Sequence, residues 1–372
     1  MNCLHLCNDL LGSKVHKNLY NHLGNLNLQQ TIFFASRKNI SEKDQKFINS
    51  LLGEVIVSKP IKTFHRVFFK RKIKFLYNNL KTRTDFSKFD IVHASTLYSD
   101  GAIALKIFEE FGIPYVVAIR GTDVNLFLRA RKDLNPLVKK ILLNASKLVF
   151  ISYSLENNFF RKRYIQTLRS GIQQKCQIIH NGIDEYWLNH IEPTRKITPY
   201  KILYIGKFNK NKNVLNLISA FLILKKSIPS LELNLVGNGG NQESEIIKLS
   251  NLHKEYIHYH GPVYSLEELR KIIHKNHIFA MASLGETFGL VYVEALTQGL
   301  PILYTQNQGI DGTFKENVGT SVIPTSIDSI YEGLYEIINN YSEYELDKID
   351  FQKFSWQYIS SIYFNLYKTI IN

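Results

Sequence analysis

The sequence predicts an α/β protein made of two doubly wound domains, each with a parallel sheet between layers of helices. In the first half, short apolar runs alternate with stretches of helical periodicity, which is typical of a parallel sheet with crossover helices. The same alternation begins again at 201, after a polar stretch that contains proline. A chain of 372 residues is also too long for one ordinary core, so we expect two domains.

The composition is that of a folded protein rather than a disordered or membrane-spanning one. Hydrophobic residues make up 45% and charged residues 21%. No run of eighteen apolar residues occurs, and the first residues lack the basic-then-apolar order of a signal peptide, so we expect a cytoplasmic protein. The three cysteines form no Cys-x-x-Cys pair, and we expect reduced thiols packed in strands at Cys3, Cys7 and Cys176.

The net charge of +14 favours anionic partners, such as nucleic acid, acidic lipid head groups or phosphorylated substrates. Segment 59–83 is strongly basic and contains no acidic residue. Its cations include Lys62, Arg66, Lys70, Arg71, Lys72, Lys74 and Lys81, interleaved with Phe64, Val67, Phe68, Phe69, Phe75 and Leu76. Two interpretations stay open: a surface helix on an anionic membrane, or a solvated basic face over a buried apolar one.

Seven strands are predicted in the first half: Cys3–Cys7, Thr31–Ala35, Val55–Val57, Asp90–Ala94, Tyr115–Ile119, Lys147–Ser152 and Cys176–Ile179. All but the last lead into loops at the carboxyl ends of the strands, where such sheets bind ligands. The first loop contains Gly12, which permits close backbone approach. Later strands end near His93 and near Arg120 and Asp123. Arg120 can bind a phosphate through two hydrogen bonds or form an ion pair with Asp123, and both alternatives remain.

In the second half, a strand from Lys201 ends at Gly206 and is followed by Lys207 and Lys212, before a helix over 214–226. Further strands are expected at Leu231–Val236, which leads into Gly237, within Tyr256–Val263, and at Pro301–Tyr304. A final helix, Trp356–Ile370, can be capped by Ser355.

The stretch 284–301 starts as a glycine-containing turn and continues as a helix that stops near Gly299. Glu286 lies on the turn and Glu294 about two helical turns later, so their carboxylates are up to ~12 Å apart along the axis. That spacing suits an elongated ligand held at both ends, with a helix N-terminus facing negative charge between them. A nucleotide diphosphate sugar has this layout. The alternative is an ordinary helix-start charge at Glu286 and a solvated Glu294.

With its Glu-Thr-Phe-Gly start and Glu-Ala-Leu continuation, this stretch resembles the Glu-x7-Glu signature of the retaining glycosyltransferases of family four. The resemblance implies the GT-B fold, in which two Rossmann-like domains face a central cleft. It divides the chain into an acceptor-side domain 1–184, a linker 185–200, a nucleotide-sugar domain 201–354, and a last helix 355–372 that crosses back. In the family the first glutamate contacts the donor sugar and the second the ribose, which assigns these roles to Glu286 and Glu294. The amides between them bind the diphosphate, here those of Thr287, Phe288, Gly289 and Leu290.

Other motifs match less closely. Gly206-Lys207 to Lys212 is similar to the family's Gly-Arg-x4-Lys element, whose two cations bind the donor diphosphate, but lysine replaces the arginine. Gly12-Ser13 stands where relatives often have two glycines, and Arg120 replaces the histidine of His-Gly-x-Asp. The resemblance assigns Gly12, Gly206 and Gly237 to donor binding. It assigns His93, Arg120 and Asp123 to the acceptor or sugar side.

The implied enzyme transfers a hexosyl or N-acetylhexosaminyl group, with retention, from a UDP- or GDP-sugar to a hydroxyl of a glycan or lipid-linked acceptor. Bacterial surface polysaccharide synthesis is the expected setting, on the inner face of the membrane if segment 59–83 binds it. Glu286, Lys207 and Lys212 are the expected catalytic residues. No Asp-x-Asp motif occurs, so we expect neither a metal nor another cofactor. Another GT-B enzyme, such as a sugar-phosphate synthase or a polymer-extending transferase, remains an alternative, and a basic nucleic-acid-binding protein is a remote one.

Overall fold

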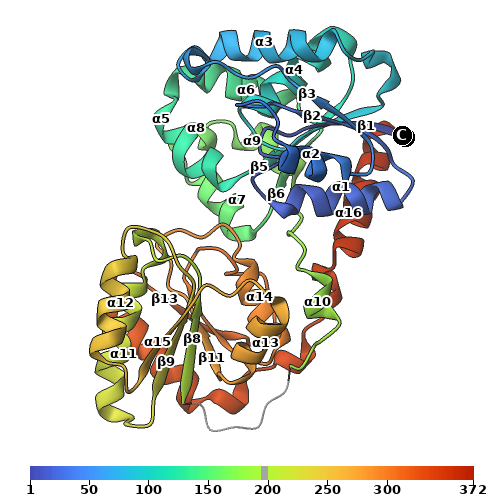
Figure 1. Cartoon of the computed structure of the whole chain (residues 1–372). Coiled ribbons are helices and arrows are strands. Elements are labelled where there is room, and N and C mark those ends of the chain that lie inside the picture. The colour runs from blue at the N-terminus through green and yellow to red at the C-terminus, as the bar shows by residue number, and fades with distance from the viewer. Residues whose placement is uncertain (194–199) are drawn as a thin grey trace. The chain divides into compact units, whose positions relative to one another are not determined.

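The computed structural model describes residues 1–193 and 200–372, so residues 194–199 of the predicted linker lie outside the described residues. The chain divides into two compact units (Figure 1). Unit 1 comprises Met1–Ile151, Leu155–Gly182 and Trp356–Asn372, and unit 2 comprises Ser152–Ser154 and Ile183–Ser355.

Unit 1 is built on a seven-stranded parallel sheet with the order β3-β2-β1-β4-β5-β6-β7. The strands are β1 (Asn2–Leu6), β2 (Gln29–Phe34), β3 (Glu54–Val57), β4 (Ile91–Ala94), β5 (Tyr115–Ile119), β6 (Lys147–Phe150) and β7 (Cys176–Ile178). All seven predicted strands are therefore confirmed to within a residue or two. The order reverses between β1 and β4, which is where doubly wound sheets open a crevice at the carboxyl ends of their strands.

Helices cover both faces of this sheet (Figure 1). On one face α1 packs against the C-terminal helix α16, and the shared core includes Leu19, Tyr20, Trp356, Ile359 and Tyr363. On the other face α4 packs against α3 and α6. The helices of this half are α1 (Lys14–Asn25), α2 (Glu42–Asn49), α3 (Phe69–Lys81), α4 (Ser99–Phe111), α5 (Leu128–Ala130), α6 (Asn135–Asn144), α7 (Tyr153–Phe160), α8 (Arg163–Gln166), α9 (Arg169–Ile172) and α16 (Trp356–Ile371).

Unit 2 has a six-stranded parallel sheet with the order β10-β9-β8-β11-β12-β13. The strands are β8 (Lys201–Ile205), β9 (Glu232–Val236), β10 (Ile257–Gly261), β11 (Ile278–Ala280), β12 (Ile302–Thr305) and β13 (Gly319–Val322). The helices are α10 (Glu185–Leu188), α11 (Val214–Ser227), α12 (Glu243–Leu252), α13 (Leu266–His274), α14 (Leu290–Thr297) and α15 (Ile327–Asn339). Figure 1 shows α11, α12 and α15 on one side of the sheet and α13 and α14 on the other. With unit 1, this gives the predicted α/β fold with two Rossmann-like sheets.

Part of the predicted linker is folded. Its first residues form α10, where the Asp184 side chain accepts a hydrogen bond from the Tyr186 amide and Trp187 is completely buried. This stretch therefore packs as part of unit 2 instead of forming an exposed connection.

The basic segment 59–83 contains α3, which turns its apolar side inward. Phe69, Ile73, Leu76 and Tyr77 are buried, whereas Phe64, Val67 and Phe68 of the preceding turn are exposed by 43%, 71% and 51%. The apolar side of the helix is thus buried, as the solvated-face interpretation expects, and in this segment the turn before the helix presents apolar side chains outward. Among the described residues no helix is long and apolar enough to cross a membrane. The three cysteines are free thiols, two of them buried.

Candidate active site

The candidate site in unit 2 begins at the loop that follows β8. Asn209 accepts a hydrogen bond from the Lys212 amide at 3.0 Å and caps a short 3₁₀ turn, Lys210–Lys212. Asn213 has φ 58° and donates its side-chain amide to the carbonyls of Ala282 and Pro324, at 2.9 and 2.7 Å. These contacts fix the backbone on either side of Lys212, so its side chain leaves from a rigid position.

Lys212 forms an ion pair with Glu286. The Nζ atom lies 2.6 Å from Glu286 Oε2, and the two side chains are only 23% and 13% exposed. The other oxygen of Glu286, Oε1, accepts a hydrogen bond from the Thr287 amide at 3.1 Å. The structure therefore joins two residues 74 positions apart in the sequence that were predicted to serve one donor site.

The loop 307–312, where the family resemblance weakens, supports Glu286 from the other side. The Gly309 amide donates to the Glu286 carbonyl at 3.0 Å, and the Gln308 side chain accepts from the Glu286 amide at 3.4 Å. Gly309 has φ 54°, and a Cβ atom there would lie 2.8 Å from Glu286 Cγ. Gln308 and Gly309 were not predicted as site residues, although a glycine beside a polar side chain in the loop after a strand could have indicated them.

The turn after Glu286 leads directly into α14. Gly289 has φ 82° and forms the N-cap, and the helix runs Leu290–Thr297. The first amides of a helix have no partner within the helix, and the helix dipole favours negative charge at this end. Phe288 is buried and packs against Phe354, with ring centroids 6.1 Å apart. The Thr287–Leu290 stretch is thus a fixed turn at a helix N-terminus, as an anion site requires.

Glu294 lies on α14, about one turn from its start, and is half-buried. Burial raises the pKa of its carboxyl to about 7, and the nearby Asp184 charge adds to this shift. Near neutral pH this carboxyl can exchange a proton, and its ionised form is a strong acceptor for hydroxyl groups.

The two strand-end glycines make a close backbone crossing. A Cβ atom on Gly237, which has φ 136°, would lie 1.9 Å from the Gly206 carbonyl oxygen. The Gly206 amide donates to Val236 and the Gly237 amide to Gly261. These glycines let the loops after β8 and β9 converge, and their own amides are already occupied. Lys207 is exposed on the first of these loops.

In unit 1, Gly12 is exposed in the turn before α1, and a Cβ atom there would lie 2.3 Å from Asp9 Oδ1. His93 is completely buried in β4, where its Nδ1 lies 2.7 Å from the Tyr367 hydroxyl. Its Nε2 has no partner among the described residues. Burial holds the pKa of His93 well below its usual value. The predicted contact between His93 and an acceptor gains no support from this interior position.

Arg120 and Asp123 do lie together, but not as the ion pair that was one of the two alternatives. The Asp123 carboxylate accepts hydrogen bonds from the amides of Arg120 and Leu97, at 2.9 and 3.1 Å. Burial raises its pKa to about 6, and these hydrogen bonds oppose the shift. Arg120 Nε donates to the Ser95 carbonyl at 3.1 Å. Among the described residues no ion pair links the two side chains, so phosphate binding by Arg120 stays open.

No group of three His, Cys, Asp or Glu side chains that could hold a metal ion is found in ranges 1–193 and 200–372.

Two family models match the chain, one after the other. The model described as Glycosyltransferase Family 4 matches residues 13–186, and the model described as Glycosyl transferases group 1 matches residues 187–349. The second match contains the whole of the Lys212–Glu286 site. The chain belongs to the family four, group 1 glycosyltransferases and has the GT-B fold.

Individual proteins are similar over most of the chain. A glycosyltransferase of Methanocaldococcus jannaschii, MJ1607, is 24% identical over 306 residues, which cover 76% of this chain and 75% of that protein. The lipopolysaccharide outer core galactosyltransferase WaaB has a similar structure, with a TM-score of 0.72, 16% identity and 100% coverage of both chains. Anabaena HepE in complex with UDP and glucose gives a TM-score of 0.65 at 14% identity, covering 99% of this chain and 100% of that one. At these identities the structural matches establish the fold.

Proposed function

We propose that this glycosyltransferase moves a sugar from a nucleotide diphosphate sugar to an acceptor hydroxyl with retention of anomeric configuration. The proposal depends most on the ion pair of Lys212 with Glu286 beside the N-terminus of α14. That arrangement combines a cation and helix amides for the diphosphate with a carboxylate for the sugar hydroxyls. The roles assigned to Lys207, Lys212, Glu286 and Glu294 belong to this proposal.

Cleavage of the bond between the sugar and the phosphate requires this combination of cation, amides and carboxylate. The bond between the anomeric carbon and the phosphate oxygen breaks, so positive charge develops on the sugar and negative charge on the leaving diphosphate. Lys212, Lys207 and the amides of Phe288, Gly289 and Leu290 stabilise the leaving group, while the Thr287 amide is bound to Glu286. The acceptor oxygen bonds to the anomeric carbon on the face that the diphosphate leaves, and its proton passes to a phosphate oxygen. Preorganised donors of this kind are worth about 10²–10³ each in rate.

The donor carries UDP or GDP, and Glu294 accepts hydrogen bonds from the ribose hydroxyls. The complex of HepE with UDP and glucose supports a UDP-sugar as the first donor to test. WaaB is a lipopolysaccharide outer core galactosyltransferase, which supports a surface glycan as the product here. We infer a bacterial surface polysaccharide with a lipid-linked acceptor, handled at the cytoplasmic face.

The experiment starts with UDP- and GDP-sugars screened by thermal shift. Turnover of a hit is then followed by NMR of the anomeric proton, with and without chelator. The proposal predicts a product of the donor's own anomeric configuration and a rate that chelator leaves largely intact. An inverted product would refute the retaining mechanism, and complete loss in chelator would refute metal independence.

Attachment to an anionic membrane is a separate part of the proposal. The exposed side chains of Val67 and Phe68 precede a helix whose exposed residues include Lys70, Arg71 and Lys74. Each basic group near an anionic surface is worth about 1 kcal/mol before screening. Sedimentation with anionic vesicles should fall as salt rises and should be lost when these three cations become glutamate. Equal sedimentation with neutral vesicles would argue against an electrostatic contact.

A further inference from the structure

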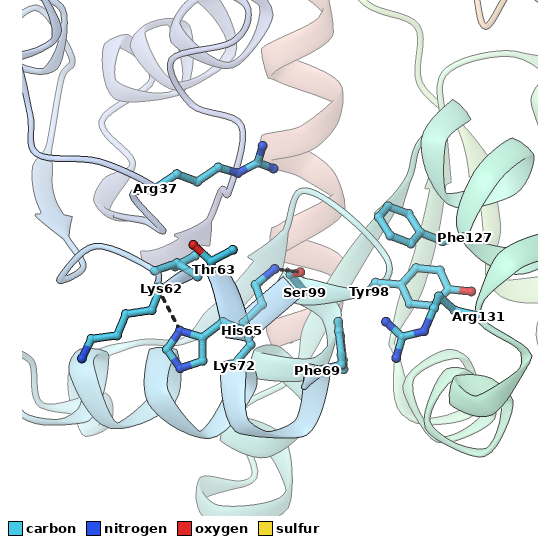
Figure 2. A pocket seen from close by; sticks show the side chains of 11 residues that line it. Arg37, Lys62, Thr63, His65, Phe69, Lys72, Tyr98, Ser99, Phe127 and Arg131 are labelled. Atoms are coloured by element: carbon cyan, nitrogen blue, oxygen red, sulfur yellow. Dashed lines mark hydrogen bonds between the residues drawn. The ribbon is translucent and has the colours of Figure 1, made fainter. Parts of the chain in front are cut away.

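Unit 1 contains a cavity of about 380 Å³ that none of the predicted site residues line (Figure 2). Its walls come from the chain that follows the carboxyl ends of β2, β3, β4 and β5, which is the edge where doubly wound sheets bind ligands. The lining residues are Arg37, Ile61, Lys62, Thr63, His65, Phe69, Lys72, Tyr98, Ser99, Phe127 and Arg131.

The lining is strongly cationic. It includes four basic side chains, those of Arg37, Lys62, Lys72 and Arg131, and no acidic one. Arg131 is neutralised by Asp133 through two hydrogen bonds of 2.8 and 2.7 Å. In the described part of the chain, Arg37, Lys62 and Lys72 form no ion pair with any carboxylate. Three positive charges around one cavity are therefore left without a protein counterion.

Lys72 shows that this charge is held in place rather than free in solvent. Its Nζ donates a hydrogen bond of 2.7 Å to Ser99 Oγ, at the start of α4 (Figure 2). Burial lowers the pKa of Lys72 and the charge of Arg37 lowers it further, while Asp100 opposes both. Asp100 is itself buried with its pKa raised to about 7, and its carboxyl is hydrogen-bonded to Asn8 and Thr96. Asp100 therefore offsets the positive charge of Lys72 only in part.

Tyr98 forms part of the cavity wall, and its side chain is 2% exposed. Figure 2 shows its hydroxyl pointing away from the side chains of Arg37 and Lys72, so its ring rather than its hydroxyl is turned to the cations. The Tyr98 ring lies 5.1 Å from that of Phe127 and 6.5 Å from that of Phe69. An aromatic wall thus stands beside the cations.

We propose that this cavity binds the phosphate group of a phosphorylated acceptor, through Arg37, Lys62 and Lys72, with the rest of the acceptor against Tyr98 and Phe127. The proposal rests on the proposed glycosyl transfer and names the class of its acceptor. A carboxylate has one charge and two oxygens, which a single arginine fork satisfies. A phosphate monoester carries nearly two charges and three acceptor oxygens, so it matches several cations. The phosphate can belong to a soluble sugar phosphate or to a lipid head group.

The test compares the full chain with the double variant Arg37→Gln/Lys72→Gln, at constant ionic strength. In the soluble arm, glucose 6-phosphate and glucose are titrated by calorimetry. In the lipid arm, phosphatidylcholine vesicles contain either phosphatidic acid or enough oleic acid to give the same surface charge. The control, Lys43→Gln/Lys46→Gln, removes two exposed lysines of α2 that neither line this cavity nor belong to the basic segment 59–83.

We expect the wild-type chain to prefer the phosphorylated probe in one arm, which identifies the source of the phosphate. The double variant should lose that preference by roughly tenfold or more, since each charge-assisted hydrogen bond contributes to binding. The control should keep it. No preference in either arm, or an equal loss in the control, would overturn the proposal.

Nucleoside diphosphate affinity, measured on the same samples, keeps this test separate from the proposed function. All variants should bind the nucleotide as the wild type does, because the donor residues lie in unit 2. Absence of nucleotide binding by the wild type would refute the proposed donor site. The phosphate preference of the cavity would then still stand as a separate result.

Discussion

Lys212→Ala tests whether the ion pair of unit 2 belongs to a diphosphate site. The Nζ of Lys212 is 2.6 Å from Glu286, and both side chains are largely buried. Loss of one charge-assisted contact with a diphosphate costs about 1.5–3 kcal/mol, which corresponds to a roughly ten- to hundredfold weaker Kd.

The same change has a stability cost that can be estimated. Exposed ion pairs contribute about 0–1 kcal/mol, and breaking a fully buried pair costs about 3–5 kcal/mol. With 23% and 13% exposure, this pair lies between those limits, and we expect a loss of about 1–2 kcal/mol. For a domain of this size that lowers the Tm by about 3–6 °C.

Calorimetric titration with UDP and GDP, together with a melting curve, measures both effects. Lys210→Ala is the matched control, because Lys210 belongs to the same 3₁₀ turn but its side chain is exposed. Unchanged nucleotide affinity in Lys212→Ala, or an equal loss in both variants, would refute the argument that Lys212 binds the diphosphate.

Three further changes test other contacts. Glu294→Gln should weaken nucleotide binding about fivefold at pH 8. Burial raises the pKa of Glu294 to about 7, so ionising this carboxyl costs folding stability above pH 7 and costs none below pH 4.5. The free energy of unfolding of the variant should therefore exceed that of the wild type by about 2 kcal/mol at pH 8 and equal it near pH 4. An equal difference at both pH values would contradict this. Gly237→Ala should lower the free energy of unfolding in urea by more than about 3 kcal/mol, because the new Cβ atom would meet the Gly206 carbonyl. Gly239→Ala is the control: a Cβ atom there would have no neighbour within 4 Å, and the loss should be about 1 kcal/mol. Tyr367→Phe removes the hydrogen-bond partner of His93 and should cost about 1–3 kcal/mol; an unchanged Tm would show that water replaces the hydroxyl.

Much of the fold could be predicted because parallel strands buried on both faces appear as continuous apolar runs. The exceptions are informative. β11 has only three residues, and β13 begins at a glycine and has the polar sequence Gly-Thr-Ser-Val. β11 is apolar but too short to be distinguished as a strand, and β13 is too polar to be distinguished from a loop. α10 was missed because four residues are too few to show a helical period.

The donor side of the site was predictable because its residues fall into two short motifs with defined spacing. The contacts that hold them were not. Asn213 binds carbonyls near 282 and 324, and Gly309 binds the Glu286 carbonyl. Such contacts depend on which strand ends become neighbours. The cavity of unit 1 was missed for the same reason, because its lining residues follow four different strands, β2 to β5. His93 shows that a polar residue at a strand end can lie wholly inside.

The most direct test of the central claim is the turnover number of Glu286→Ala with the nucleotide sugar that the wild type accepts. The two carboxylate oxygens of Glu286 accept hydrogen bonds from Lys212 Nζ and from the Thr287 amide. This carboxylate is expected to hold the donor sugar. The turnover number should therefore fall by about 10²-fold or more. The Tm should fall by no more than about 6 °C, as for Lys212→Ala. Turnover within tenfold of the wild type, in a variant that is shown to be folded, would contradict the assignment of this carboxylate to the active site.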